Sequence, residues 1–133
     1  MEELKNILSS HSLRLTTARK AVFNALETSS EPLSVAQIYQ QCPGIDRTSA
    51  YRVVQKFLDL NIITEVPRGW KVRYELAEPF KAHHHHLQCQ KCGEIVALDT
   101  PALESLINNL ATSHSYTLTN HHVELTGVCK KCQ

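Results

Sequence analysis

Two Cys-x-x-Cys pairs constrain this chain more than any other feature of its sequence. The pairs are Cys89/Cys92 and Cys129/Cys132, with 36 residues between them. Each pair can place two thiolates on one tight turn, and two such turns complete a tetrahedral zinc site with Zn–S distances of ~2.3 Å. A four-sulfur site has no open position, so we predict one structural Zn²⁺ per chain. A redox pair or two unrelated motifs are the alternatives.

The expected compartment favours metal ligation over disulfides. The sequence begins MEELKNILSS, which lacks the positive charge and long apolar stretch of a secretory signal. No apolar run approaches the ~20 residues of a membrane span. We therefore expect a cytoplasmic protein with no membrane partner, and in a reducing compartment paired cysteines are more often metal ligands than disulfides.

Four consecutive histidines occupy residues 83–86. If this run is extended, His83 and His85 point to one face of the strand while His84 and His86 point to the other. Two faces predict two different metal sites, and each needs further ligands from elsewhere in the chain. A solvated histidine cluster is the alternative. The candidate additional ligands are Glu75, Glu104, His121 and His122.

Composition divides the chain near residue 76. The chain has 133 residues, 42% of them hydrophobic and 20% charged, which suits one folded domain or two small ones and excludes a large catalytic barrel. Residues 1–76 contain ten Lys and Arg and eight Asp and Glu. Residues 77–133 contain four Lys and Arg and five Asp and Glu. We predict one domain over residues 1–76, a hinge over 77–82 and a metal-binding domain over 83–133.

The first domain follows the winged helix-turn-helix pattern. Apolar residues at helical spacing predict four helices, and the second begins at Thr16 or Thr17. Ser34 with Gln37 forms a capping-box pattern before the third helix, and Asp46 can cap the fourth. Strands are predicted over residues 61–66 and 71–76, joined by a turn through 67–70.

The second domain is predicted to be a small α/β unit. Its strand candidates are residues 83–89, 94–99 and 121–128, a mixed set interrupted by one helix. Thr100 can cap that helix, with Pro101 at its first position. The fold class is therefore α+β. The helix is expected to bury a stripe made of Leu103, Leu106, Ile107 and Leu110.

The fourth helix carries a polar face that suits double-stranded DNA. Arg52 can pair bidentately with guanine, and Tyr51 on the flank can contact a thymine methyl group. Thr48, Gln55 and Lys56 can hold phosphates or base edges, although an ordinary solvated face is the alternative. Basic side chains outside this helix that can neutralise phosphates are Arg14, Arg19, Arg68, Lys71 and Arg73.

Several motifs, taken in order, resemble the ferric uptake regulator (Fur) family. They are Arg14-Leu15-Thr16-x-x-Arg19, Ser49-Ala50-Tyr51-Arg52-Val53-Val54, Tyr74-Glu75-Leu76, the histidine run with Leu87-x-Cys89-x-x-Cys92-Gly93, and Gly127-Val128-Cys129-x-x-Cys132. The resemblance implies a homodimeric, metal-dependent repressor with an N-terminal winged helix and a C-terminal dimerisation domain. The family includes sensors of iron, zinc, manganese and peroxide.

The resemblance also implies roles for particular residues. It places structural zinc at the four paired cysteines, makes Tyr51 and Arg52 the base-contacting pair, and puts Arg14 near the minor groove. The regulatory metal site implied by the family is Glu75, His84 and His86. The second implied metal site is His83, His85, Glu104 and His121. Operator DNA and a second copy of the chain are the implied partners, with no small-molecule substrate.

Departures from the family pattern bear on the regulatory metal. Many iron and peroxide sensors place a ligand histidine where this chain has Glu31-Pro32-Leu33, and an acidic residue where it has Ala97. The remaining ligands of the regulatory site are Glu75, His84 and His86, completed by water or by Glu65. This low-coordinate, nitrogen-rich set suits zinc better than ferrous ion. Zinc sensors often add a cysteine near Glu75, which is missing here. We therefore expect regulatory Zn²⁺ or Fe²⁺, with zinc slightly favoured.

The sequence bears on two function classes other than the repressor. A zinc enzyme is disfavoured because the chain has no H-E-x-x-H or H-x-E…C-x-x-C motif and little room for a substrate pocket. We expect no enzymatic activity. The alternative kept open is a zinc-binding protein-interaction or metal-buffering module without operator binding.

Overall fold

The computed structural model describes residues 1–68 and 70–133, and it divides the chain into two compact units. The first unit is Met1–Ala82, and the second is His83–Gln133, which begins with the histidine run. Within the described residues, no helix combines the length and the apolar character needed to cross a membrane.

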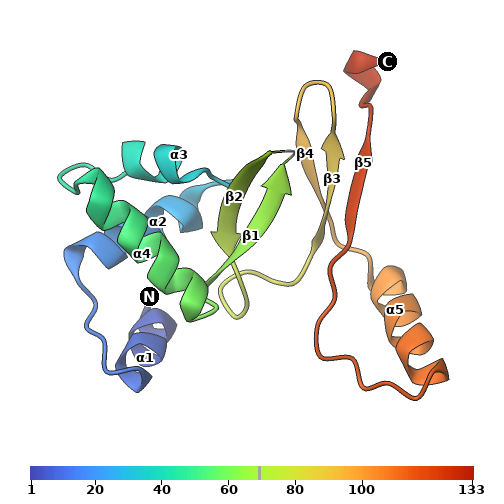
Figure 1. The fold of residues 1–133 in the computed structure, drawn as a ribbon, viewed down its shortest axis with the longest axis horizontal. Coiled ribbons are helices and arrows are strands. Elements are labelled where there is room, and N and C mark those ends of the chain that lie inside the picture. Colours follow the sequence, from blue (N-terminus) through green and yellow to red (C-terminus); the bar gives the residue numbers. More distant parts are fainter. Residues whose placement is uncertain (69) are drawn as a thin grey trace. The chain divides into compact units, whose positions relative to one another are not determined.

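Four helices and a β-hairpin form the first unit (Figure 1). Local sequence determines where the helices begin. Thr16 accepts a hydrogen bond from Arg19 N, Ser34 and Gln37 form the predicted capping box, and Asp46 accepts from Ser49 N. The elements are α1 (Glu2–Ser10), α2 (Thr17–Thr28), α3 (Val35–Gln40), α4 (Arg47–Asp59), β1 (Ile63–Arg68) and β2 (Lys71–Leu76).

The core of this unit lies between α2, α3, α4 and the hairpin. Phe23, Ile38 and Phe57 are fully buried in it. The predicted apolar stripe of α4 is buried from Ala50 to Phe57, with Leu58 half-buried at its end. Burial of this stripe fixes the helix so that its opposite, polar face is exposed.

The hairpin is longer at its turn end than the sequence predicts. β1 and β2 are antiparallel, with Ile63 opposite Leu76 and Arg68 opposite Lys71. Residues 67 and 68, predicted as turn, are therefore strand, because Pro67 is tolerated at the edge of a two-stranded sheet. Asn61 has φ +53° and belongs to the turn after α4 instead of the strand. Of the other two residues of the predicted turn, Trp70 is in a turn and Gly69 lies outside the described residues.

The second unit is a mixed three-stranded sheet with one long helix (Figure 1). Strand β3 lies in the middle, antiparallel to β4 and parallel to β5, as the predicted mixed set requires. The strands are shorter than predicted, since β3 begins two residues and β5 three residues later than expected. The elements are β3 (His85–Cys89), β4 (Ile95–Leu98), α5 (Pro101–Ser113), β5 (Glu124–Gly127) and the 3₁₀ turn η1 (Lys130–Cys132).

The prediction of a buried stripe on α5 is wrong for the single chain. Leu106 and Leu110 are each 55% exposed, and Leu103 and Ile107 are only half-buried. Figure 1 shows why, because α5 lies beyond one end of the strands and not over the face of the sheet. Its apolar face therefore has no layer of the second unit, residues 83–133, to pack against.

A solvent-exposed apolar stripe also crosses one face of the sheet. Leu87 on β3 lies opposite Val96 on β4 and opposite Leu125 on β5. Side chains in direct register point to the same face, so the three form one row. All three are exposed, which makes this unit unusually rich in uncovered apolar surface.

Candidate metal and DNA sites

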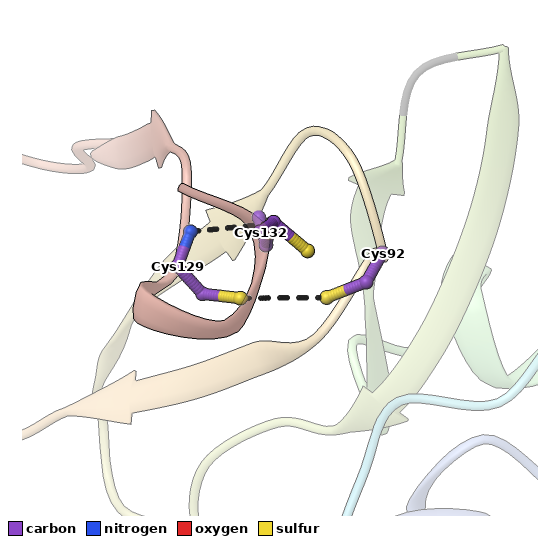
Figure 2. A group of neighbouring side chains, drawn as sticks. Cys92, Cys129 and Cys132 are labelled. Carbon is purple, nitrogen blue, oxygen red and sulfur yellow. Dashed lines mark hydrogen bonds between the residues drawn. The ribbon is translucent and has the colours of Figure 1, made fainter.

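The topology of the sheet brings the four paired cysteines together. Cys89 ends β3 and lies opposite Gly127 of β5, so the turns after these parallel strands leave the same end of the sheet. One turn carries Cys92 and the other carries Cys129 and Cys132 (Figure 2). The four sulfur atoms all lie within 4.8 Å of one another.

The spacing of the sulfur atoms fits a tetrahedral zinc ion. Cys92 Sγ and Cys129 Sγ are 3.7 Å apart, and both cysteines are free thiols. The edge of a tetrahedron with Zn–S bonds of ~2.3 Å is about 3.8 Å. A disulfide would require about 2.05 Å. This donor set therefore matches zinc and does not match an oxidised pair.

Ionisation of the four thiols is uneven. Backbone N–H groups of Cys129 and Cys92 donate to the Cys89 sulfur and lower the pKa of that thiol to about 5. Hydrogen bonding to Cys129, together with desolvation, raises the pKa of Cys132 to about 12. Desolvation also raises the pKa of the Cys129 thiol, so the cluster holds a thiolate readily at Cys89 and keeps protons on Cys129 and Cys132, which a divalent cation would displace on binding.

Two local contacts support this arrangement. Gly93 has φ +77° and donates its N–H to the Cys89 carbonyl at 2.8 Å, closing the first turn in a conformation that favours glycine. Lys91 Nζ donates to the Cys132 carbonyl at 3.0 Å and so links the two turns. The sequence patterns gave no indication of the Lys91 contact.

A second cluster joins three elements of the same unit. His85 Nε2 contacts a Glu104 carboxylate oxygen, and His121 Nε2 lies 3.1 Å from the other oxygen. His83 Nε2 is 3.0 Å from His121 Nε2. His83 and His85 come from the histidine run, Glu104 from the first turn of α5 and His121 from just before β5. His122 instead faces Glu124, with His122 Nε2 3.4 Å from Glu124 Oε1.

The chemistry of this cluster also suits a metal ion. A tetrahedral ion with bonds of ~2.0 Å to nitrogen separates its ligand atoms by about 3.3 Å. His83 Nε2 lies 3.0 Å from His121 Nε2 and 3.4 Å from Glu104 Oε1, which brackets that value, while the His85–Glu104 contact is closer. Hydrogen bonds from His85 and His121 lower the pKa of the Glu104 carboxyl, so it is ready to act as an anionic ligand. The side chain of His85 is buried.

The other half of the histidine run forms a separate pair. His84 Nε2 and His86 Nε2 are 3.2 Å apart, so odd and even histidines separate as strand alternation predicts. Ala97 on β4 lies opposite His86 and offers no ligand. Glu75, the third ligand implied by the family, belongs to the first unit. There it is buried near the end of β2, with Lys81 Nζ 2.7 Å from Oε2.

The segment before α3, where the family resemblance led us to look for a histidine ligand, is held by ordinary contacts. Leu33 and Tyr74 exchange backbone hydrogen bonds of 2.8 and 2.9 Å. Arg73 Nη1 donates to the carbonyl of the buried Pro32 at 3.1 Å. Arg73, expected on the wing as a phosphate contact, thus uses one donor inside the unit. The sequence showed neither this role nor the ion pair of Lys81, because both join residues without a recognisable spacing.

The polar face of α4 is open to solvent as predicted. Thr48, Tyr51, Arg52 and Gln55 are all exposed on it. Near the start of α2, Arg14 is exposed, whereas Arg19 is half-buried and its Nη1 donates to the Arg14 carbonyl. Trp70 beside the wing tip is fully exposed. These positions leave the predicted base contacts sterically free.

A helical unit with a two-stranded wing, followed by a small unit that gathers cysteines, histidines and a carboxylate, defines a class of metal-dependent DNA-binding regulators. Residues 10–126 match the model of the Ferric uptake regulator family. The chain belongs to this family.

Relatives and solved structures agree with that membership. The chain is 27% identical over 139 aligned positions to the ferric uptake regulation protein of Bacillus subtilis strain 168, covering 99% of this chain and 93% of that protein. It is 29% identical to the peroxide-responsive repressor PerR of Staphylococcus saprophyticus, covering 100% of this chain and 91% of that one. The Helicobacter pylori ferric uptake regulator, described as having three functional metal binding sites, superposes with a TM-score of 0.82, 26% identity and coverage of 98% and 89%. A zinc-bound manganese uptake regulator superposes with a TM-score of 0.71, 29% identity and coverage of 95% and 98%.

These findings confirm the predicted family and the α+β fold class. The protein is a metal-responsive transcriptional regulator and not an enzyme. Proteins of this family are dimeric and bind DNA. Relatives of comparable similarity respond to different inputs, so the comparisons do not distinguish a zinc sensor from an iron or peroxide sensor.

Proposed function

We propose that this protein is a zinc-responsive repressor that binds operator DNA as a homodimer. The observation that carries the choice of metal is the His84–His86 pair, with Nε2 atoms 3.2 Å apart and Ala97 opposite. Two imidazole nitrogens with few oxygen ligands suit tetrahedral zinc, whereas ferrous ion prefers more ligands. The buried Pro32, where many iron sensors have a histidine, supports the same choice.

On this proposal the hinge ligands come from both units. His84 and His86 supply nitrogens from the second unit, and Glu75 supplies a carboxylate from the first. Zinc, when bound, provides a Lewis-acidic centre that accepts these lone pairs. Ligation by both units restricts their relative motion. Less conformational entropy is then lost when the two copies of α4 in a dimer, which we call the reading helices, bind adjacent major-groove half-sites.

The other two clusters have separate proposed roles. Cys89, Cys92, Cys129 and Cys132 hold a structural zinc ion that fastens η1 to the end of β3. His83, His85, Glu104 and His121 form a second metal site that fastens α5 to the sheet. Since α5 has little other packing, ligation of Glu104 would fix the surface that we propose forms the dimer.

For DNA, we propose that Tyr51 and Arg52 contact base edges while Thr48 and Gln55 hold phosphates or base edges. Arg14 and Arg19 would neutralise the backbone beside them. All of these except Arg19 are exposed, and the exposed face belongs to the helix whose other side fills the core. Phosphate contacts make binding depend steeply on salt, which a protein-interaction or metal-buffering module would not show.

The test is a DNA titration at buffered free metal. Duplexes are first selected from a random library in parallel with Zn²⁺, Fe²⁺ and Mn²⁺, and affinity for the enriched duplex is then measured by fluorescence anisotropy. We expect tight binding with Zn²⁺ at free concentrations where Fe²⁺ and Mn²⁺ give little. Equal affinity with and without zinc, or selective response to Fe²⁺, would contradict zinc sensing.

A further inference from the structure

Glu75 is a buried carboxylate with a positive charge against it. Its side chain is 7% exposed, and Lys81 Nζ lies 2.7 Å from its Oε2 atom. A carboxylate removed from water needs a compensating partner, and an ammonium group at this distance provides one. Both partners of this ion pair belong to the first unit.

Lys81 is held in place by the backbone and by packing. The N–H groups of Phe80 and Lys81 both donate to the Ala77 carbonyl, at 3.0 and 3.2 Å. The Phe80 ring packs edge-on against Phe23 of α2, with centroids 4.9 Å apart and planes at 76°. The turn after β2 is therefore anchored to the core, and this anchored turn presents the ammonium group to Glu75.

We propose that Lys81 is a built-in counter-ion that competes with the hinge metal for Glu75 and so sets the metal concentration at which the hinge fills. The inference rests on the proposed function, in which Glu75 is a hinge ligand. A divalent ion needs a lone pair of the same carboxylate, and it repels an ammonium group held this close. Lys81 must therefore withdraw when metal binds. Its side chain is already 35% exposed, which gives the ammonium group a path to water.

A purely structural ion pair would behave differently. Removing a structural pair weakens the fold, and it leaves metal affinity unchanged or lowers it because the ligand is less well held. Removing a competitor weakens the metal-free form but raises metal affinity. For a substitution that removes the Lys81 charge, the competitor role predicts higher metal affinity and the structural role predicts unchanged or lower affinity. Metal affinity measured without DNA is therefore the decisive quantity.

The experiment uses the full chain with its cysteine-bound zinc retained and with Glu104→Ala added to remove the second cluster. Zn²⁺ affinity is measured by competition with a fluorescent chelator of known affinity. We expect Lys81→Met to bind Zn²⁺ about tenfold more tightly than the parent, a typical size for coupling between two binding events. Lys81→Arg, which keeps the charge, should stay close to the parent. Lys5→Met, which removes the exposed Lys5–Glu2 pair, is the matched control and should change nothing.

Two further measurements separate the possible failures. Without hinge metal, Lys81→Met should unfold at lower urea concentration than the parent, because Glu75 has lost its ammonium partner. Unchanged or weaker Zn²⁺ binding by Lys81→Met overturns the counter-ion role. If Glu75→Gln binds Zn²⁺ as tightly as the parent, Glu75 is not a hinge ligand and the proposed function fails with it. If Glu75→Gln loses the hinge zinc while Lys81→Met binds as the parent does, only the counter-ion proposal is overturned.

Discussion

Arg52 is the residue on which base recognition depends in the proposed complex. Its side chain is exposed on α4 and its donor geometry matches the O6 and N7 atoms of guanine. Arg52→Ala should lose ~1–3 kcal/mol of discrimination between the selected operator and a guanine-substituted one. Competition anisotropy with the two duplexes measures this difference. An unchanged preference would remove Arg52 from the base-reading set, and Lys56→Ala, which alters a side chain paired with Asp59, is the control.

Asp46 gives the stability of the first unit a dependence on pH. Its carboxylate accepts hydrogen bonds from Ser49 N at 2.9 Å and from Ser49 Oγ at 2.6 Å, which lower its pKa in the folded state. Because the folded pKa lies below the unfolded one, this stabilisation is present above the unfolded pKa and is lost as pH falls through the folded pKa.

Asp46→Asn separates capping from ionisation, since asparagine caps helices well but does not titrate. Urea unfolding followed below about pH 4, where an unperturbed aspartate becomes protonated, should show a shallower loss of stability in the variant than in the parent. The expected reason is that only the parent takes up a proton at this position on unfolding. Parallel curves for the two proteins would show that the cap contributes no pH dependence.

The residues that the sequence located correctly are those whose geometry follows from spacing alone. Strand alternation separated His83 and His85 from His84 and His86, and the structure reproduces that separation. The choice of His121 over His122 could not be made from residue type, because it depends on where the chain enters β5. Lys81 was missed because its importance comes from a turn anchored by Phe80, which no local pattern indicates.

At the scale of elements, the capping box of α3 stabilises a helix of only 6 residues. Ser34 Oγ accepts from Gln37 N at 3.3 Å, and Gln37 Oε1 accepts from Ser34 N at 2.9 Å. Ser34→Ala should lower the free energy of unfolding by ~1 kcal/mol, because one N–H of the first turn loses its acceptor. Urea unfolding followed by circular dichroism measures this. Ser9→Ala on α1 is the control, and an equal loss there would contradict a specific capping effect.

The uncovered face of α5 predicts the behaviour of the dimer. Leu110 is 55% exposed in the single chain, so Leu110→Glu should leave the fold of the first unit intact. If this face is buried between two copies, the variant should sediment as a monomer. It should also lose about 10²-fold in operator affinity, since two linked reading helices bind far more tightly than one. A variant that remains dimeric would place the dimer contact elsewhere.

The helices of the first unit could be predicted from sequence because their caps and apolar stripes are local. The burial of the α5 stripe could not be predicted correctly. Apolar periodicity indicates that one face of a helix will be covered, but it does not indicate whether the same chain or a second copy covers it. For Leu106 and Leu110 no other layer of this unit supplies the cover. The start of β1 was misjudged for a simpler reason, since Asn61 adopts a positive φ that ends the preceding turn.

For the whole molecule, the clusters predict a two-step response to chelation. On the proposed assignment, the four paired cysteines would enclose a zinc ion without an open position, whereas the hinge would offer fewer ligands and a competing ammonium group. In a chain carrying Glu104→Ala, which lacks the second cluster, mild chelation should therefore remove hinge metal and DNA binding together while about one zinc ion per chain remains, as measured by elemental analysis alongside anisotropy. Loss of all zinc in one step would contradict separate structural and regulatory sites.

Removal of the proposed structural zinc should affect one unit only. Cys92→Ser breaks the link between the turns after β3 and β5, and the second unit has little other core to compensate. Hydrogen exchange should then show loss of protection in residues 83–133, while the helices of residues 1–68 remain protected. Equal loss in both units would show that they unfold together.

The parallel pairing of β3 with β5 has a consequence for how the protein is made. More than 30 residues, including all of α5, separate β3 from β5. The sheet of the second unit therefore cannot be completed until β5 has been synthesised. The hairpin and helices of the first unit all lie within residues 2–76, so they leave the ribosome and can fold earlier. A nascent chain that has not yet reached Glu124 thus carries a folded reading helix before the two cysteine turns can meet.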